Sequence, residues 1–131
     1  MAWAVEFTDE FEAWWNVLSE GEQVDVAASV RLIEELGPAL GRPHVDTVQG
    51  SRHPNMKELR VQHSGRPYRV LFAFDPLRSA ILLLGGDKTG DARWYDRNIP
   101  IADDLFDDHL RTVEREMKRG REGAEHGKKL Q

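Results

Sequence analysis

The stretch from Lys57 to Tyr95 constrains the fold more than any other part of the chain, because it reads as two consecutive β-hairpins. Its first hairpin is predicted to turn at Ser64-Gly65, a dipeptide that favours tight two-residue turns. That turn sets Leu59 opposite Val70 and makes one face of the hairpin apolar. A small antiparallel sheet is therefore the predicted centre of the fold.

The same register places three charged side chains on the other face, with Glu58 on one strand and Arg60 directly opposite Arg69. Two facing arginines repel each other unless an anion lies between or over them, and a carboxylate with two guanidinium groups suits a phosphodiester. The alternative is the ordinary solvated face of an antiparallel sheet, on which Glu and Arg are common. Both interpretations stay open from the pattern alone.

The length of 131 residues is that of one domain, which we predict over residues 1–119 with a disordered tail over 120–131. That tail has little to bury. The chain has no cysteine, which excludes disulfides and thiolate metal sites and fits a reducing cytosol. No apolar run approaches the roughly 20 residues that cross a bilayer, and no signal-peptide pattern opens the chain. The expectation is a cytoplasmic protein with no membrane partner.

The charges are distributed unevenly around a net charge of −5. Residues 1–41 carry one basic and nine acidic side chains, whereas residues 42–100 carry ten basic and six acidic ones. The acidic total argues against a general nucleic-acid binder. The basic hairpin region is compatible with local steering of an anionic ligand and equally with chance.

Two helices are predicted after a short strand over residues 2–7. Thr8 is the expected N-cap of the first helix, and Ser19 opens the second through a capping box with Glu22. The second helix should end at Gly37, since glycine is the residue that most often follows a helix. Two adjacent helices joined by a short break predict a helical hairpin packed on the sheet.

Residues 37–55 show no periodicity, and a loop of this length inside a compact domain is often functional. The loop delivers Arg52 and His53 to the start of a predicted strand over residues 56–63. No histidine pair in the chain has the spacing of metal ligands, so no metal is predicted.

The chain after the first hairpin is predicted to form a strand over 67–74, a turn at 75–78 and a strand over 80–84 that is buried on both faces. A glycine-rich corner over 85–90 follows. This corner lacks the spacing of a nucleotide-binding P-loop. Its backbone amides and Lys88 offer a place for one phosphate, although a structural turn is the simpler interpretation.

A short helix over residues 91–97 is predicted to present Arg93 and Tyr95. A longer amphipathic helix should begin after Pro100. The longer helix is acidic at its start and basic at its end, which suits the helix dipole, so these charges need no functional explanation.

Three runs of residues together resemble the HigB-like toxins of the RelE/ParE superfamily, and most closely their phage-derived branch. The runs are SRHPNMKELR at 51–60, YRVLF at 68–72 and GGDK at 85–88. The resemblance covers roughly residues 2–112. It implies a RelE-like α+β fold, with a small antiparallel-rich sheet, an N-terminal helical hairpin on one face and a C-terminal helix.

The resemblance also implies a function, namely the toxin of a type II toxin–antitoxin system. Many members cleave mRNA at the ribosome without a metal or other cofactor, and a small antitoxin, often a helix-turn-helix protein, holds them inactive. The ParE branch supplies the alternative, a non-nucleolytic binding protein such as a gyrase poison or a regulator. The net charge of −5 differs from the strongly basic surface that the resemblance implies for typical ribosome-dependent members.

Roles for single residues come from the chemistry that RNA cleavage needs. A base must take the proton of the ribose 2′-OH, cations must stabilise charge on phosphorus, and an acid must protonate the 5′-oxygen. The acid stays open between His53, Lys88 and Tyr95. The predicted catalytic residues are Glu58 as the base, Arg60 and Arg69 as the phosphate clamp, and Lys88; the predicted substrate-binding residues are Arg52, His53, Lys57, Arg93 and Tyr95.

Overall fold

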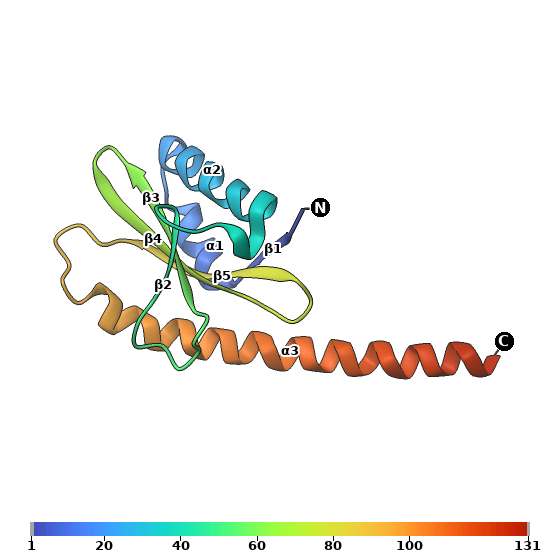
Figure 1. Cartoon of the computed structure of the whole chain (residues 1–131). Helices are drawn as coiled ribbons and strands as arrows, with labels where there is room; N and C mark the ends of the chain where they lie inside the picture. Colours follow the sequence, from blue (N-terminus) through green and yellow to red (C-terminus); the bar gives the residue numbers. More distant parts are fainter. Residues whose placement is uncertain (1, 131) are drawn as a thin grey trace.

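The structure, a computed structural model, describes the backbone of residues 2–130 and the side chains of residues 2–120. Five strands form one sheet in the order β1-β5-β4-β3-β2, with helices on both faces (Figure 1). In chain order the elements are β1 (Ala4–Phe7), α1 (Asp9–Asn16), α2 (Glu20–Leu36), the 3-10 helix η1 (Gly37–Ala39), β2 (Val45–Thr47), β3 (Lys57–His63), β4 (Arg66–Phe74), β5 (Ser79–Asp87) and α3 (Trp94–Leu130). The predicted α+β architecture is confirmed.

The β3–β4 hairpin has the predicted turn and register. Ser64 and Gly65 both have positive φ angles, 50° and 78°, as a tight hairpin turn requires. Leu59 pairs with Val70, and Arg60 lies opposite Arg69. The sheet is antiparallel except at β1, which runs parallel to β5. The alternation and the turn dipeptide thus determine the centre of the fold.

The helical hairpin packs on one face of the sheet. The Thr8 side chain accepts a hydrogen bond from the Phe11 amide and caps α1, and the capping box of Ser19 and Glu22 opens α2. The apolar core on this face joins the two helices to β3, β4 and β5; its buried members include Phe11, Val26, Ile33, Leu59, Val61, Tyr68, Val70, Phe72 and Leu82. This layer contains the side chains that alternation had assigned to the apolar face.

The opposite face is not the open, solvated surface that one of the two interpretations expected, because α3 covers part of it (Figure 1). A second buried core lies between α3 and the sheet, with Met56, Leu71, Ala73, Ile81, Leu83, Trp94, Ile99, Ala102 and Phe106 among its members. The molecule therefore has three layers, and the charged side of the β3–β4 hairpin lies next to the start of α3.

The long loop over residues 37–55 proves to contain two regular elements, so its prediction as irregular chain is wrong. The 3-10 helix η1 follows α2 directly, and β2 pairs antiparallel with β3 at the edge of the sheet. In β2 only Val45 is buried. Three residues with one buried side chain are too few to show an alternating pattern, which explains why the strand escaped prediction.

Two boundaries near the C-terminal half also differ from prediction. Gly85, Gly86 and Asp87 continue β5 and are not part of a glycine-rich corner. The two predicted helices are one helix, α3, with Pro100 inside it. Buried side chains recur at helical spacing on both sides of the proline, and their packing outweighs the lost backbone hydrogen bond.

The predicted disordered tail, 120–131, falls almost wholly on residues whose side chains lie outside the described part. Its backbone belongs to α3 as far as Leu130. No helix in the described part of the chain is long and apolar enough to cross a membrane.

Gly85 should not tolerate a larger residue. A Cβ atom at this position would lie 2.4 Å from the Trp14 ring. We expect Gly85→Ala to lower the free energy of unfolding by about 1–3 kcal/mol through overpacking. Chemical denaturation measures this, and Gly41→Ala is the matched control because a Cβ there meets nothing within 4 Å. Equal stability of the two variants would contradict the packing described.

An acid-sensitive contact ties α2 to β4. The Tyr68 hydroxyl donates to the Glu22 carboxylate, and this bond, together with the hydrogen bonds between Glu22 and the N-cap residue Ser19, lowers the Glu22 pKa from 4.5 to about 2. A carboxyl whose pKa is depressed in the folded state adds stability above its unfolded pKa and loses it as the pH falls. We expect stability to decline between pH 4.5 and about pH 2, and Glu22→Gln to flatten this decline. Denaturation at a series of pH values tests this, with Glu20→Gln, in the same helical turn, keeping the wild-type slope.

Candidate functional site

Glu58 lies at the centre of a charged cluster on the α3 side of the sheet. Its carboxylate is 7% exposed and accepts a hydrogen bond from Arg60 Nε at 3.0 Å. Arg69 Nε lies 3.9 Å from the same carboxylate oxygen. Glu58, Arg60, Arg69 and Tyr95 are called the Glu58 cluster below. The carboxylate thus lies between the two facing arginines and relieves the repulsion that their register creates.

Arg69 has donor capacity that the fold does not use. Its side chain is 12% exposed, and Nη1 donates to the Tyr68 carbonyl at 3.0 Å. Among the described residues Arg69 Nε is buried without a hydrogen-bond partner. A buried donor without a partner carries a desolvation penalty, and an anionic group bound beside it would remove that penalty. The fold therefore leaves part of the hydrogen-bonding capacity of Arg69 unused.

Tyr95 reaches the cluster from the first turn of α3. The neighbouring Trp94 is buried and anchors this turn against Gly86, at which a Cβ would lie 2.5 Å from the indole nitrogen. Burial and the Glu58 carboxylate raise the pKa of the Tyr95 hydroxyl, while Arg69 opposes that shift. The phenol therefore stays protonated at neutral pH and faces both Glu58 and Arg69.

Lys88 stands beside the cluster as a second cation. Its ammonium lies 5.8 Å from the centre of the Tyr95 ring. The backbone amide of Lys88 donates to the Pro67 carbonyl at 3.1 Å, so the residue is held where β5 ends. Of the residues predicted from the sequence, the structure brings together Glu58, Arg60, Arg69, Lys88 and Tyr95.

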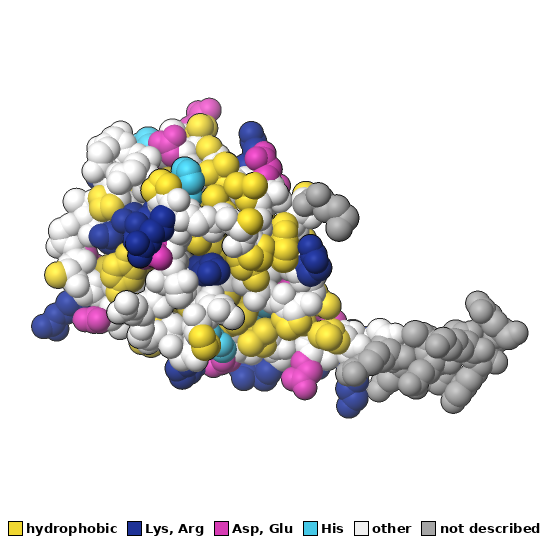
Figure 2. All heavy atoms as spheres, viewed as in Figure 1, with side chains coloured by type: hydrophobic (Ala, Val, Ile, Leu, Met, Phe, Trp, Pro, Cys, Tyr) yellow, Lys and Arg dark blue, Asp and Glu magenta, His cyan; other side chains and the backbone are white. Residues whose placement is uncertain are grey.

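Asp46 and Arg42 border the cluster, and sequence reasoning missed both. Asp46 lies opposite Glu58 in the β2–β3 pair and accepts from Arg60 Nη2 at 3.2 Å and from Arg42 Nη2 at 3.0 Å. Arg42 is the main cause of the lowered pKa of Asp46. Figure 2 shows Lys and Arg side chains gathered over the region of β3 and β4. Only the edge strand β2 could have indicated these two residues.

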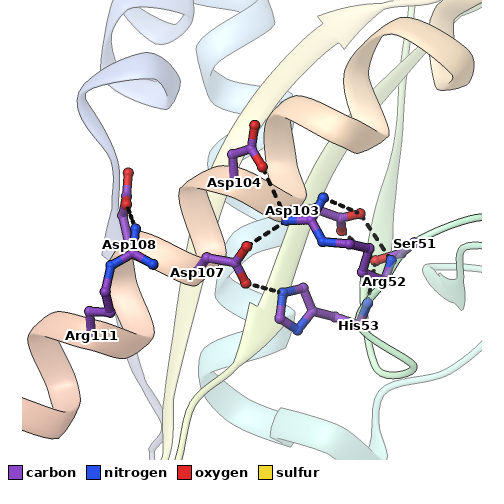
Figure 3. A network of polar contacts seen from close by, with 8 residues as sticks. All are labelled: Ser51, Arg52, His53, Asp103, Asp104, Asp107, Asp108 and Arg111. Atoms are coloured by element: carbon purple, nitrogen blue, oxygen red, sulfur yellow. Dashed lines mark hydrogen bonds and ion pairs between the residues drawn. The ribbon is translucent and has the colours of Figure 1, made fainter.

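Arg52 and His53 have a structural role in a different network, which attaches the loop after β2 to α3 (Figure 3). Arg52 pairs with Asp104 and Asp107, and His53 Nε2 lies 2.7 Å from Asp107. These contacts, Arg52 first, lower the pKa of the Asp107 carboxyl. The structure gives neither residue a described contact with the Glu58 cluster.

The same loop is fixed by the buried Asp103, whose carboxylate accepts from the Ser51 hydroxyl at 2.5 Å and from the Arg52 amide at 2.9 Å (Figure 3).

Two further predicted substrate-binding residues lie apart from the cluster. Lys57 projects to the helical-hairpin side, as alternation requires, and its ammonium lies 3.5 Å from the Thr47 hydroxyl. Arg93 is exposed immediately before α3. Neither Lys57 nor Arg93 has a described contact with Glu58.

One group in the described part of the chain offers three metal-binding atoms close together, from Glu6, Asp75 and His109. The buried Asp75 carboxylate is already occupied, because one oxygen accepts from the Leu77 and Ser79 amides and the other lies 2.7 Å from His109 Nε2. These bonds tie α3 to the β4–β5 turn. The group thus has a structural explanation that needs no ion.

The fold defines a class of protein. The archaeal RelE of Pyrococcus horikoshii OT3, solved in complex with RelB, superposes with a TM-score of 0.51 at 15% sequence identity, over 70% of this chain and 100% of that chain. At that identity the likeness establishes the RelE fold alone.

The family follows from the sequence. The model of the family described as Phage derived protein Gp49-like matches residues 13–107. Two Mycobacterium tuberculosis proteins classed as candidate toxins, HigB2 and HigB3, are each 50% identical to this chain over 108 residues. The match to HigB2 covers 81% of this chain and 54% of HigB2, so the chain spans about half the length of that relative. The match to HigB3 covers 82% of this chain and 93% of HigB3. The chain belongs to the phage-derived Gp49-like family of HigB-like proteins with the RelE fold.

Proposed function

We propose that the chain is the toxin of a type II toxin–antitoxin pair and that it cleaves mRNA at the Glu58 cluster. The names of HigB2 and HigB3 support the toxin role, and a RelE homologue bound to RelB supports an antitoxin as partner. The observation that carries the nuclease part is the buried Arg69 Nε, which has no described partner and lies beside a carboxylate and a phenol. A phosphodiester oxygen can pair with the part of the Arg69 guanidinium that stays exposed, since 12% of the side chain is accessible.

The cluster offers a group for each step of the reaction. Glu58 takes the proton of the ribose 2′-OH, and the 2′-oxygen then attacks the adjacent phosphorus. Arg69 donates to the phosphoryl oxygens as negative charge develops on them. Tyr95 gives its proton to the departing 5′-oxygen, which leaves a 2′,3′-cyclic phosphate on one fragment and a 5′-hydroxyl on the other.

The remaining groups position the reacting ones. Arg60 bonds both Glu58 and Asp46, so it holds the carboxylate in place more than it binds phosphate. Lys88 lies over the Tyr95 ring and stabilises the phenolate that forms when the proton leaves. Transfer of the proton from Glu58 back to Tyr95, which face each other, restores the site.

The proposed setting is the cytoplasm, with mRNA on the ribosome as substrate and a small helix-turn-helix antitoxin as partner. The test is induced expression of the chain in a bacterial host. Growth arrest with mRNA broken inside codons is the expected result, and co-expression of the antitoxin should relieve it. Arrest with intact mRNA and an induced DNA-damage response would contradict the nuclease and favour a gyrase poison.

A further inference from the structure

An apolar groove lies on the helical-hairpin side of the sheet, where β1, α1 and α2 meet. It encloses about 490 Å³. Its apolar lining comes from β1 through Val5 and Phe7, from α1 through Phe11 and Trp15, and from α2 through Val30. This feature is called the β1–α2 groove below.

The groove leaves apolar surface in contact with solvent. Phe7 is 55% exposed, although it is a large aromatic side chain on a strand of the sheet. β1 is an edge strand, since within residues 2–130 β5 is its only neighbour in the sheet order. An exposed apolar concavity with polar residues at its border is typical of a surface that binds another protein.

The charge around the groove selects the partner. Glu12 and Glu34 line it together with a single cation, Arg31. Arg31 is also the only basic side chain among residues 1–41, against nine acidic ones. Complementary potentials favour association and like charges oppose it. The surface is therefore suited to a segment with apolar side chains on one side and Lys or Arg on the other.

The shape of the groove favours a helix as that segment. One wall is α2, a helix of 17 residues, and helices pack side by side with their axes about 8–10 Å apart. The start of β1 is already bonded to the end of α2, because the Trp3 amide donates to the Glu34 carbonyl at 2.7 Å. Because this backbone amide is already bonded, it is not free to pair with a further strand added along the edge of β1. An amphipathic helix can instead place its apolar stripe between α2 and β1.

We propose that the β1–α2 groove binds a basic amphipathic helix of a partner protein. Identifying that partner as the antitoxin rests on the proposed toxin function. The groove opens on the face of the sheet covered by α1 and α2, whereas Glu58 pairs with Leu71 on the face covered by α3. A helix in the groove therefore leaves the Glu58 cluster uncovered, which is a different arrangement from an antitoxin that plugs the RNA site.

The experiment uses two model helices of about 18 residues, roughly five turns, with the same leucine stripe. One carries lysines on its polar face and the other glutamates. Fluorescence anisotropy of the labelled peptides with the full chain should show binding of the lysine peptide alone. Binding of both with equal affinity would overturn the proposal, because charge would then play no part.

Matched variants locate the binding. Glu34→Arg should weaken the lysine peptide about tenfold, whereas Glu35→Arg, the next residue and also exposed, should not. Phe7→Ala should also weaken it about tenfold, and Leu36→Ala, similarly exposed at 49% but outside the groove, should not. Equal effects within either pair would overturn the assignment of the groove.

Cleavage assays on the same variants separate this proposal from the proposed function. Glu34→Arg and Phe7→Ala should break mRNA as the wild type does, because neither residue contacts the Glu58 cluster. A chain that binds the lysine peptide in the groove but leaves mRNA intact would support the groove and contradict the nuclease. A chain that cleaves mRNA without binding the peptide would overturn the groove alone.

Discussion

Arg69→Ala is expected to reduce mRNA cleavage by about 10²–10³, the loss typical of one electrostatic donor at a transition state. The physical reason is the buried Nε atom of Arg69, which has no described partner and lies next to the proposed base. Removing it takes away a donor already desolvated and held in place by the Tyr68 carbonyl. The measurement is growth arrest after induction together with mRNA cleavage, and thermal melting reports whether the variant folds.

Arg66→Ala is the matched control for that change. Arg66 is on the same strand, but its side chain lies toward α2, within 3.9 Å of Glu22, on the opposite face of the sheet. It should cleave mRNA at close to the wild-type rate. Arg69→Lys keeps the charge without the two-pronged geometry, so partial activity is expected. If Arg69→Ala folds normally and stays fully toxic, the Glu58 cluster is not the site.

Glu58→Gln should have a comparably large effect, a loss of about 10²–10⁴ in cleavage, because an amide cannot accept the 2′-hydroxyl proton. The shape of the side chain is unchanged, and the amide oxygen can still accept from Arg60. Folding should therefore survive, with some loss of stability from two arginines that no longer share a carboxylate. Rates of mRNA cleavage and melting temperatures measure the two effects separately.

Asp46→Asn controls for the loss of a negative charge near Arg60. Asp46 contacts the same arginine at 3.2 Å but lies on β2, one strand further from Arg69. We expect a loss of less than tenfold, since only the positioning of Arg60 changes. A Glu58→Gln variant that keeps the activity of Asp46→Asn would show that Glu58 is a structural partner of Arg60 and not a base.

The sheet and its charged face could be predicted from the sequence because short-range rules determine them. The turn at Ser64-Gly65 sets the register, and the two-residue period of a strand then places Glu58, Arg60 and Arg69 on one face. The covering of that face by α3 depends on long-range packing. Pro100 suggested a helix start, whereas the buried residues on both sides of it maintain one helix from Trp94.

The residues of the candidate site likewise divide into those that short-range rules place and those that long-range packing places. Tyr95 was a candidate acid among three, and only the packing of Trp94 against Gly86 shows that it reaches Glu58. Arg52 and His53 were expected near the site because of their place in the chain. The carboxylates of Asp103 and Asp107 attach both to α3 instead, and the two carboxylates lie 51–55 residues further along the chain. Such pairings between distant residues leave no local signal.

The mapping of RNA ends after induction tests the proposed mechanism most directly. Total RNA is sequenced from cells that express the wild type, Arg69→Ala or Arg66→Ala, with separate capture of each type of end group. The mechanism predicts new mRNA breaks with a 2′,3′-cyclic phosphate on one side and a 5′-hydroxyl on the other, in the wild type and Arg66→Ala but not in Arg69→Ala. Breaks with 5′-phosphate ends, or growth arrest with intact mRNA, would contradict cleavage by the Glu58 cluster.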